Sequence, residues 1–241
     1  MARQRLDQLL VERGLADSRA KARALVMAGD VLVDGQLAQR AGLMVGDAGE
    51  VNLKQKQRYV SRGGFKLEHA LDRFGLDVTG FGAADLGAST GGFTDCLLQH
   101  GATKVYAIDV GHGQLDQRLR EDPRVVTMEK VNARDDVALP EKVDLVTADL
   151  SFISLTKVLP AAVTLLKPQR TLIALLKPQF EAEPKEVRRG GVVRDTQTHA
   201  KVIGRFLKWA TAAGLSLLNL ALSPITGPAG NREFLIQLAP S

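Results

Sequence analysis

The chain has 241 residues, of which 45% are hydrophobic and 24% are charged, and its net charge is +5. This is typical of an ordinary globular protein with one large domain and one small one. The single cysteine, Cys96, excludes an internal disulfide framework, and the four histidines are isolated from other ligand-type residues, so no metal site is predicted. The start of the chain carries charges where a secretory segment would be apolar, and residues 209–231 are too interrupted for a membrane helix, so we expect a cytoplasmic protein.

The first 60 residues predict a small basic domain, with 10 Lys and Arg against 7 Asp and Glu. Apolar residues at helical spacing predict a short helix that Gly14 ends and a second helix that Asp17 or Ser18 begins. The packed side chains of the second helix are expected to be Ala20, Ala24 and Met27. Strands are expected at 31–33 and 50–53, so this domain should be α+β.

Arg19 and Arg23 lie four residues apart and share a helix face, with Lys21 beside them. Charge alone leaves this face open as a phosphate-binding surface or as a solvated surface. The spacing of the elements resembles the S4-type RNA-binding module, through Arg5-Leu6-Asp7, Gly14-Leu15, Ser18-Arg19, Gly29, Val31 and Val33-Asp34-Gly35. With no aromatic residue before Tyr59 to stack bases, such a module should bind the backbone and shape of folded RNA. The RNA contacts expected from this resemblance are Arg3, Arg5, Arg19, Lys21 and Arg23.

The second domain, 61–241, alternates apolar strand-like segments with amphipathic helices, which favours an α/β fold with a largely parallel sheet. Strands are expected at 83–86, 105–108, 125–127, 143–147, 171–176, 215–222 and 233–238. The last connection has about ten residues, which is too short for a parallel crossover. We therefore expect an α/β, Rossmann-like sheet of seven strands whose last strand is antiparallel.

A glycine-rich segment, 87–92, follows the first of these strands and precedes a helix, as in cofactor-binding loops. Asp109 ends the next strand, where a carboxylate can accept hydrogen bonds from ribose hydroxyls. The spacing lacks G-x-G-x-x-G, and Asp85 precedes the loop where it could meet an amino group, so S-adenosylmethionine is favoured over a dinucleotide. A plain tight turn is the alternative, and Asp135 is either an adenine contact or part of an ordinary loop. The predicted cofactor residues are Asp85, Gly87, Ala88, Ser89, Gly91, Gly92, Phe93, Asp109 and Asp135.

Two lysines and two carboxylates are expected at the same edge of this sheet. Asp149 and Lys177 directly follow strands, and the carboxyl ends of parallel strands form the ligand-binding edge. Glu233 begins the antiparallel last strand and therefore lies at that edge too. Lys66 stands in the first turn of a helix, where the helix dipole disfavours a cation, which can mark a functional site or an ordinary surface lysine.

These motifs resemble the TlyA family, which joins an S4-type module to an FtsJ-like ribose 2'-O-methyltransferase. The resemblance rests on segments 61–66, 85–94, 148–154 and 176–181 and covers nearly the whole chain. It implies methylation of ribosomal RNA at cytidine riboses, with ribosomal RNA or ribosomal subunits as partners. It also implies a catalytic tetrad of Lys66, Asp149, Lys177 and Glu233. Lys177 is our candidate for the base or proton acceptor, Asp149 and Glu233 hold the lysines, and Lys66 stabilises developing charge on oxygen.

Two other functions are compatible with the same sequence. Some members of the family are labelled haemolysins, which suggests a membrane-lytic protein, and a non-catalytic RNA-binding or assembly protein would also carry the first domain. The charged segment 181–194, with Lys185, Arg188 and Arg189, is either an RNA clamp or a solvated lid.

Overall fold

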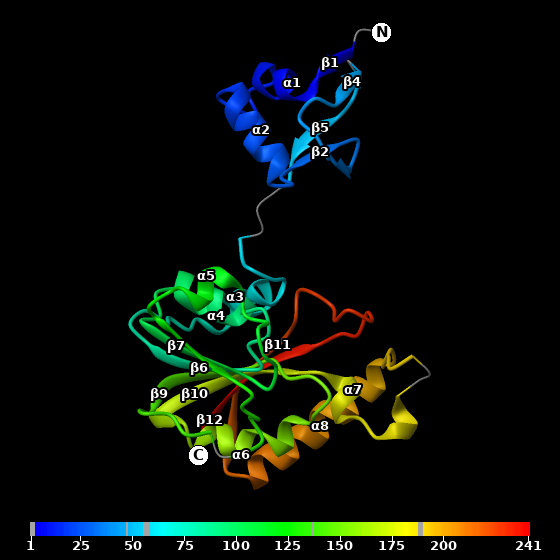
Figure 1. The fold of residues 1–241 in the computed structure, drawn as a ribbon. Coiled ribbons are helices and arrows are strands. Elements are labelled where there is room, and N and C mark those ends of the chain that lie inside the picture. Colours follow the sequence, from blue (N-terminus) through cyan, green and yellow to red (C-terminus); the bar gives the residue numbers. More distant parts are fainter. Residues whose placement is uncertain (1–2, 47, 55–57, 136, 188–189) are drawn as a thin grey trace. The chain divides into compact units, whose positions relative to one another are not determined.

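The computed structural model describes residues 3–46, 48–54, 58–135, 137–187 and 190–241. The chain forms two compact units, Met1–Arg58 and Tyr59–Ser241 (Figure 1). Arg188 and Arg189, predicted to belong to a clamp or lid, lie outside the described residues.

The amino-terminal unit packs two helices against short strands. It contains β1 (Arg3–Arg5), α1 (Leu6–Glu12), α2 (Arg19–Met27), β2 (Val31–Val33), β3 (Gln36–Leu37), β4 (Met44–Gly46) and β5 (Val51–Leu53). The side chain of Ser18 caps α2 by accepting a hydrogen bond from the amide of Lys21. The predicted packed stripe of α2 is wrong, because Ala22 and Val26 are the buried residues and Met27 is 87% exposed. Both sets have helical spacing, and only the packing of Val26 into the core of this unit decides between them.

The carboxy-terminal unit contains the seven-stranded sheet, in the order β11-β12-β10-β9-β6-β7-β8. The strands are β6 (Gly82–Leu86), β7 (Lys104–Asp109), β8 (Val125–Glu129), β9 (Val143–Ala148), β10 (Leu166–Leu176), β11 (Leu215–Leu222) and β12 (Phe234–Pro240). β12 runs antiparallel to both of its neighbours, β10 and β11, and the other adjacent strands are parallel. The predicted fold, with an antiparallel last strand, is therefore confirmed.

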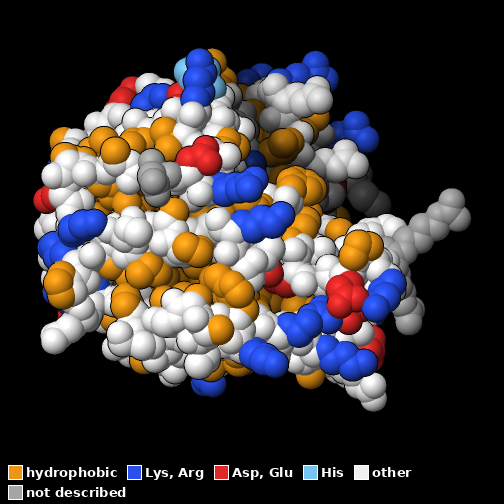
Figure 2. Space-filling model, turned by 90° about the horizontal axis from the view of Figure 1, so that it is seen from below, with side chains coloured by type: hydrophobic (Ala, Val, Ile, Leu, Met, Phe, Trp, Pro, Cys, Tyr) orange, Lys and Arg blue, Asp and Glu red, His pale blue; other side chains and the backbone are white. Residues whose placement is uncertain are grey.

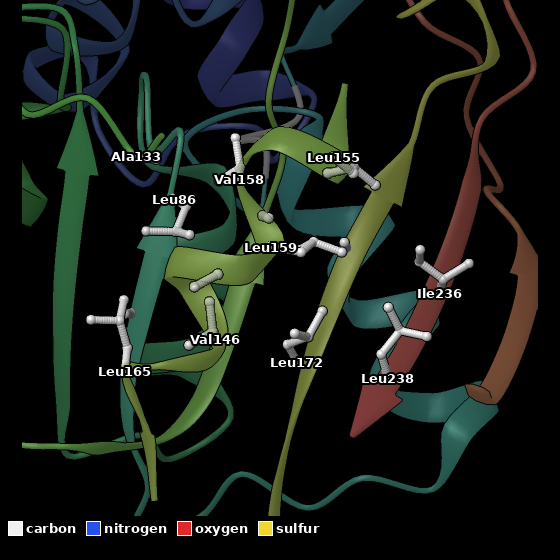
Figure 3. Close-up of a cluster of buried hydrophobic side chains, with 14 of the residues drawn as sticks. Leu86, Ala133, Val146, Leu155, Val158, Leu159, Leu165, Leu172, Ile236 and Leu238 are labelled. Atoms are coloured by element: carbon white, nitrogen blue, oxygen red, sulfur yellow. The ribbon is translucent and has the colours of Figure 1, made fainter. Parts of the chain in front are cut away.

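Helices cover both faces of this sheet (Figure 1). One face carries α3 (Gly63–Phe74), α4 (Gly92–Gln99) and α5 (Gln117–Arg120), and the other carries α6 (Leu159–Val163) and α8 (Thr196–Ala212). β9 contributes to both cores, since Leu145 packs with α3 and α4 while the next residue, Val146, packs with α6 and α8. Figure 3 shows the second core around Val146, Leu159 and Leu172. Burial on both faces explains why these strands are almost continuously apolar.

The strand order reverses at β6, which lies between β7 and β9. In open α/β sheets, ligands bind at the carboxyl ends of the strands beside such a reversal. The segments that leave β6, β9 and β10 at this edge carry the glycine-rich loop, Asp149 and Lys177, respectively.

Positively and negatively charged side chains are mixed on the surface that Figure 2 shows. Figure 2 shows lysine and arginine side chains at several separate places on one face of the molecule, with acidic side chains among them. None of the helices in the described chain has the length and apolar character needed to span a membrane. Within those same residues, no group of three or more His, Cys, Asp or Glu side chains could hold a metal ion.

Candidate active site

The loop between β6 and α4 depends on glycine at two turns. Gly87 has a φ of 83°, and a Cβ added there would lie 2.7 Å from the carbonyl oxygen of Asp149. Gly91 has a φ of 95°, and its added Cβ would lie 2.2 Å from a side-chain carbon of Leu119. Because neither turn has room for a side chain, the loop runs close to Asp149 on one side and to α5 on the other.

Asp109 fixes the other side of this loop. One of its carboxylate oxygens accepts a hydrogen bond from the amide of Ser89 at 2.8 Å, and the other accepts from the amide of Gly111 at 2.7 Å. A carboxylate offers about four acceptor positions, so each oxygen keeps capacity for a further donor such as a ribose hydroxyl. Asp109 lines a cavity of about 420 Å³. The walls of this cavity include Gly87, Ser89, Ile108, Gln114, Asn132, Ala133, Arg134, Leu150 and Phe152.

Gly87, Ser89 and Asp109 are the predicted cofactor residues that line this cavity, whereas the two other predicted carboxylates, Asp85 and Asp135, do not. The carboxylate of Asp85 is fully buried and accepts hydrogen bonds from the hydroxyls of Thr94 at 2.7 Å and Thr147 at 2.9 Å. Burial raises the pKa of Asp85 to about 6. Asp135 is exposed, and its neighbours Asn132, Ala133 and Arg134 form the cavity wall instead. Asp85 thus ties α4 to β9 beneath the glycine-rich loop.

A second cavity, of about 280 Å³, adjoins the first and shares Gly87, Ser89, Asp149 and Ser151 with it. Its other wall residues are Ser61, Arg62, Gly63, Lys66, Ala88, Thr90, Gly92, Phe93, Lys177 and Pro228. Predicted cofactor residues and predicted catalytic residues therefore face one continuous space.

The four predicted catalytic residues form two ion pairs at this second cavity. Lys66 Nζ lies 2.6 Å from Glu233 Oε2, and Lys177 Nζ lies 2.7 Å from Asp149 Oδ1. Three of the four side chains line the cavity, while Glu233 is only 1% exposed and lies behind Lys66. Each lysine thus has a carboxylate as its partner in a largely buried place, and the two pairs balance in formal charge.

Ser151 is a further polar group at this place that the sequence did not single out. Lys177 Nζ donates a hydrogen bond to Ser151 Oγ at 2.9 Å, whereas its contact with Asp149 Oδ1 lacks the direction of a hydrogen bond. The hydroxyl is thus fixed beside the ammonium group. Ser151 is exposed and lines both cavities.

Glu181 joins the two segments that carry Asp149 and Lys177. Its carboxylate accepts hydrogen bonds from the hydroxyl of Ser154 and from the amide of Leu155, each at 2.6 Å. Burial raises the pKa of Glu181. The sequence held only a weak signal of this connection, a carboxylate four residues after Lys177.

Phe152 stands at the rim of the first cavity in an unusual state. Its ring is 90% exposed, its φ is 64°, and it contacts the ring of Phe180 at a centroid distance of 5.2 Å. A positive φ is uncommon for a bulky residue and carries a strain of about 1 kcal/mol or more. Residues with such strained backbones are often found at functional sites. The sequence alone gave no sign that Phe152 is one of them.

In the amino-terminal unit, three of the five predicted RNA contacts meet at one buried carboxylate. Arg5, Arg19 and Arg23 each lie within 3.2 Å of an oxygen of Asp7, which is 0% exposed. Arg3 and Lys21 are exposed and do not take part in this cluster.

Comparison with known proteins agrees with both units. The profile of the FtsJ-like methyltransferase family matches residues 59–239, and that of the S4 domain matches residues 4–51. The chain belongs to the FtsJ-like methyltransferase family. It is 44% identical over 240 residues to the 16S/23S rRNA (cytidine-2'-O)-methyltransferase TlyA of Mycobacterium tuberculosis, covering 98% of this chain and 90% of that protein.

Two further relatives carry a different kind of name. Hemolysin A of Brachyspira hyodysenteriae is 42% identical over 234 residues, covering 96% of this chain and 98% of that protein. The solved structure of a "Putative hemolysin" from Streptococcus thermophilus is 42% identical with a TM-score of 0.75, covering 100% of this chain and 90% of that one. The two family profiles and the identity to TlyA together make the chain a TlyA-type member of the family. The predicted S4 domain and the predicted dependence on S-adenosylmethionine are therefore confirmed.

Proposed function

We propose that this protein transfers a methyl group from S-adenosylmethionine to the 2'-hydroxyl of a cytidine ribose in ribosomal RNA. The observation that carries the proposal is the pair of lysine–carboxylate contacts on a cavity wall next to the glycine-rich loop. The similarity to TlyA of Mycobacterium tuberculosis supports the choice of a cytidine ribose. Ribosomal RNA, alone or within a subunit, is then the partner, and the cytoplasm is the place of action.

The residues of the first cavity fit the cofactor. The glycine-rich loop leaves space where side chains would otherwise stand, and Asp109 keeps free acceptor positions for ribose hydroxyls. We propose that Asn132, Ala133 and Arg134 face the adenine, in preference to Asp135, because they form the wall there. Asp85 acts from beneath the loop, by holding Thr94 and Thr147.

The lysine pair supplies the chemistry at the ribose. When bound, S-adenosylmethionine supplies an electrophilic methyl group on a sulfonium. Lys177 first loses a proton to water through Ser151, and its neutral amine then accepts the proton of the 2'-hydroxyl as the oxygen bonds to the methyl carbon and that carbon leaves the sulfur. Ser151, which is exposed and bonded to Nζ, gives that proton a path to water. Lys66, held by Glu233, stabilises the charge that develops on the oxygen.

Alkaline digestion of treated RNA tests this function, because 2'-O-methylation protects the following phosphodiester bond. Wild-type protein and S-adenosylmethionine should produce protected dinucleotides in ribosomal RNA presented alone or in subunits. If neither form of RNA gains a protected site, the proposal is wrong. A purified-protein leakage assay on lipid vesicles tests the haemolysin alternative, and we expect no leakage.

A further inference from the structure

We propose that Asp7 is a positioning residue that assembles Arg19 and Arg23 into a binding site for an RNA phosphate. The inference rests on the proposed function, since it assumes that the S4 domain binds the substrate RNA. It adds a buried acidic residue to a surface otherwise defined by its arginines.

The contacts around Asp7 are unequal. Arg5 makes two hydrogen bonds to it, from Nε to Oδ1 at 3.0 Å and from a terminal nitrogen to Oδ2 at 3.1 Å. Arg5 alone therefore gives each carboxylate oxygen one hydrogen bond and balances the negative charge. Arg19 and Arg23 add one contact each, both to Oδ2 at 3.2 Å. Arg19 and Arg23 therefore add positive charge beyond what is needed to neutralise Asp7.

The charge of this cluster is out of balance. Three guanidinium groups surround one carboxylate, which leaves a formal charge of +2. Arg5 beside Asp7 holds the pKa of that carboxyl well below its usual range, so Asp7 stays ionised at neutral pH. Arg19 and Arg23 are 49% and 55% exposed, respectively. Repulsion between them disfavours this arrangement unless an anion joins it.

The remaining donors of Arg19 and Arg23 suit a phosphate. A guanidinium group has five N–H donors in a rigid fork, and each of these residues uses one nitrogen on Asp7. The two residues lie one turn apart on α2, and contact with the same oxygen keeps their guanidinium groups close together. No aromatic residue occurs in Met1–Arg58, so stacking on bases cannot supply the affinity of this unit.

A change of Asp7 to Asn separates positioning from simple charge. It removes a negative charge, so an account based on net charge predicts tighter RNA binding. The positioning account predicts weaker binding, by about tenfold, and a smaller dependence of affinity on salt as about one or two phosphate contacts are lost. Asp17→Asn is the matched control, because it removes an exposed negative charge from the same unit and leaves the cluster intact. It should bind RNA as tightly as wild type, or more tightly.

The experiment titrates full-length protein with transcribed 16S and 23S rRNA at several salt concentrations. The inference is overturned if Asp7→Asn binds as tightly as wild type or more tightly. Cofactor affinity, which belongs to the other unit, should not change. If circular dichroism shows that Asp7→Asn is unfolded, the variant R19K/R23K decides. That variant keeps every charge and loses the planar forks, and unchanged affinity would refute the inference. Failure of wild type to bind either RNA would instead count against the proposed function.

Discussion

Lys66 Nζ and Glu233 Oε2 lie 2.6 Å apart, although 167 residues separate them in the chain. Glu233 is almost fully buried, and a Cβ added to Gly227 would approach its Oε1 to 2.6 Å, so the carboxylate is tightly enclosed. Its contact with Lys66 links α3, which precedes the sheet in the chain, to the start of β12, the last strand in the chain. The position of the proposed catalytic residue Lys66 therefore depends on the packing of α3 against the end of the chain.

Replacing Glu233 with Gln should lower methyl transfer at least tenfold, which corresponds to about 1.4 kcal/mol of transition-state stabilisation. The change leaves Lys66 without a charged partner in a largely buried place. Initial rates with ribosomal subunits measure the effect. Glu141→Gln, which alters an exposed pair with Lys104, is the control and should transfer at the wild-type rate. Equal rates for both variants would show that the Lys66–Glu233 pair is dispensable.

Gly91→Ala should abolish measurable binding of S-adenosylmethionine. The turn has a φ of 95°, and the new methyl group would collide with Leu119, so the loop must move. Calorimetric titration measures the affinity. Gly204→Ala is the matched control, since Gly204 lies within α8 with open space around it. It should bind the cofactor normally and raise the free energy of unfolding by about 1 kcal/mol. Normal cofactor binding by the Gly91 variant would mean that the loop does not need this turn.

Much of the edge that carries the site could be predicted from the sequence. Apolar runs located the strands, and the rule that parallel strands end at one edge placed Asp149 and Lys177 together. The short last connection then placed Glu233 there. The orientation of Asp85 could not be predicted, because β6 is buried on both faces and its pattern does not distinguish them. Contacts between separate segments, such as those of Asp7 with α2 and of Glu181 with Ser154, produce no periodic pattern in the sequence.

Asp85 should make the stability of the carboxy-terminal unit depend on pH. Burial raises its pKa from 3.8 to about 6, so the protonated form is the one that folding favours. This contribution is complete below about pH 4 and is lost as the pH rises through 6, with a total of about 3 kcal/mol. Asp85→Asn cannot titrate, so its free energy of unfolding should fall less between pH 4 and pH 7 than that of wild type. Denaturant titrations that give parallel curves for the two proteins would contradict this assignment.

Phe152→Gly should weaken the use of RNA as substrate without lowering the stability of the protein. The ring is 90% exposed, so its loss costs little burial, and glycine relieves the strain of a positive φ. We expect the free energy of unfolding to stay the same or rise by about 1 kcal/mol. The KM for RNA should rise at least tenfold, because an exposed aromatic ring at the cavity rim is suited to stacking on a base. A destabilised protein with a normal KM would show that the ring serves only the fold.

The most direct test compares wild type with Lys177→Ala, using isotopically labelled S-adenosylmethionine, ribosomal subunits and mass spectrometry of the modified nucleotides. We predict that wild type places the label on the 2'-oxygen of a cytidine ribose. The variant should transfer no label, although its affinity for the cofactor is unchanged. Label on a base, or transfer at the full rate by the variant, would contradict the account.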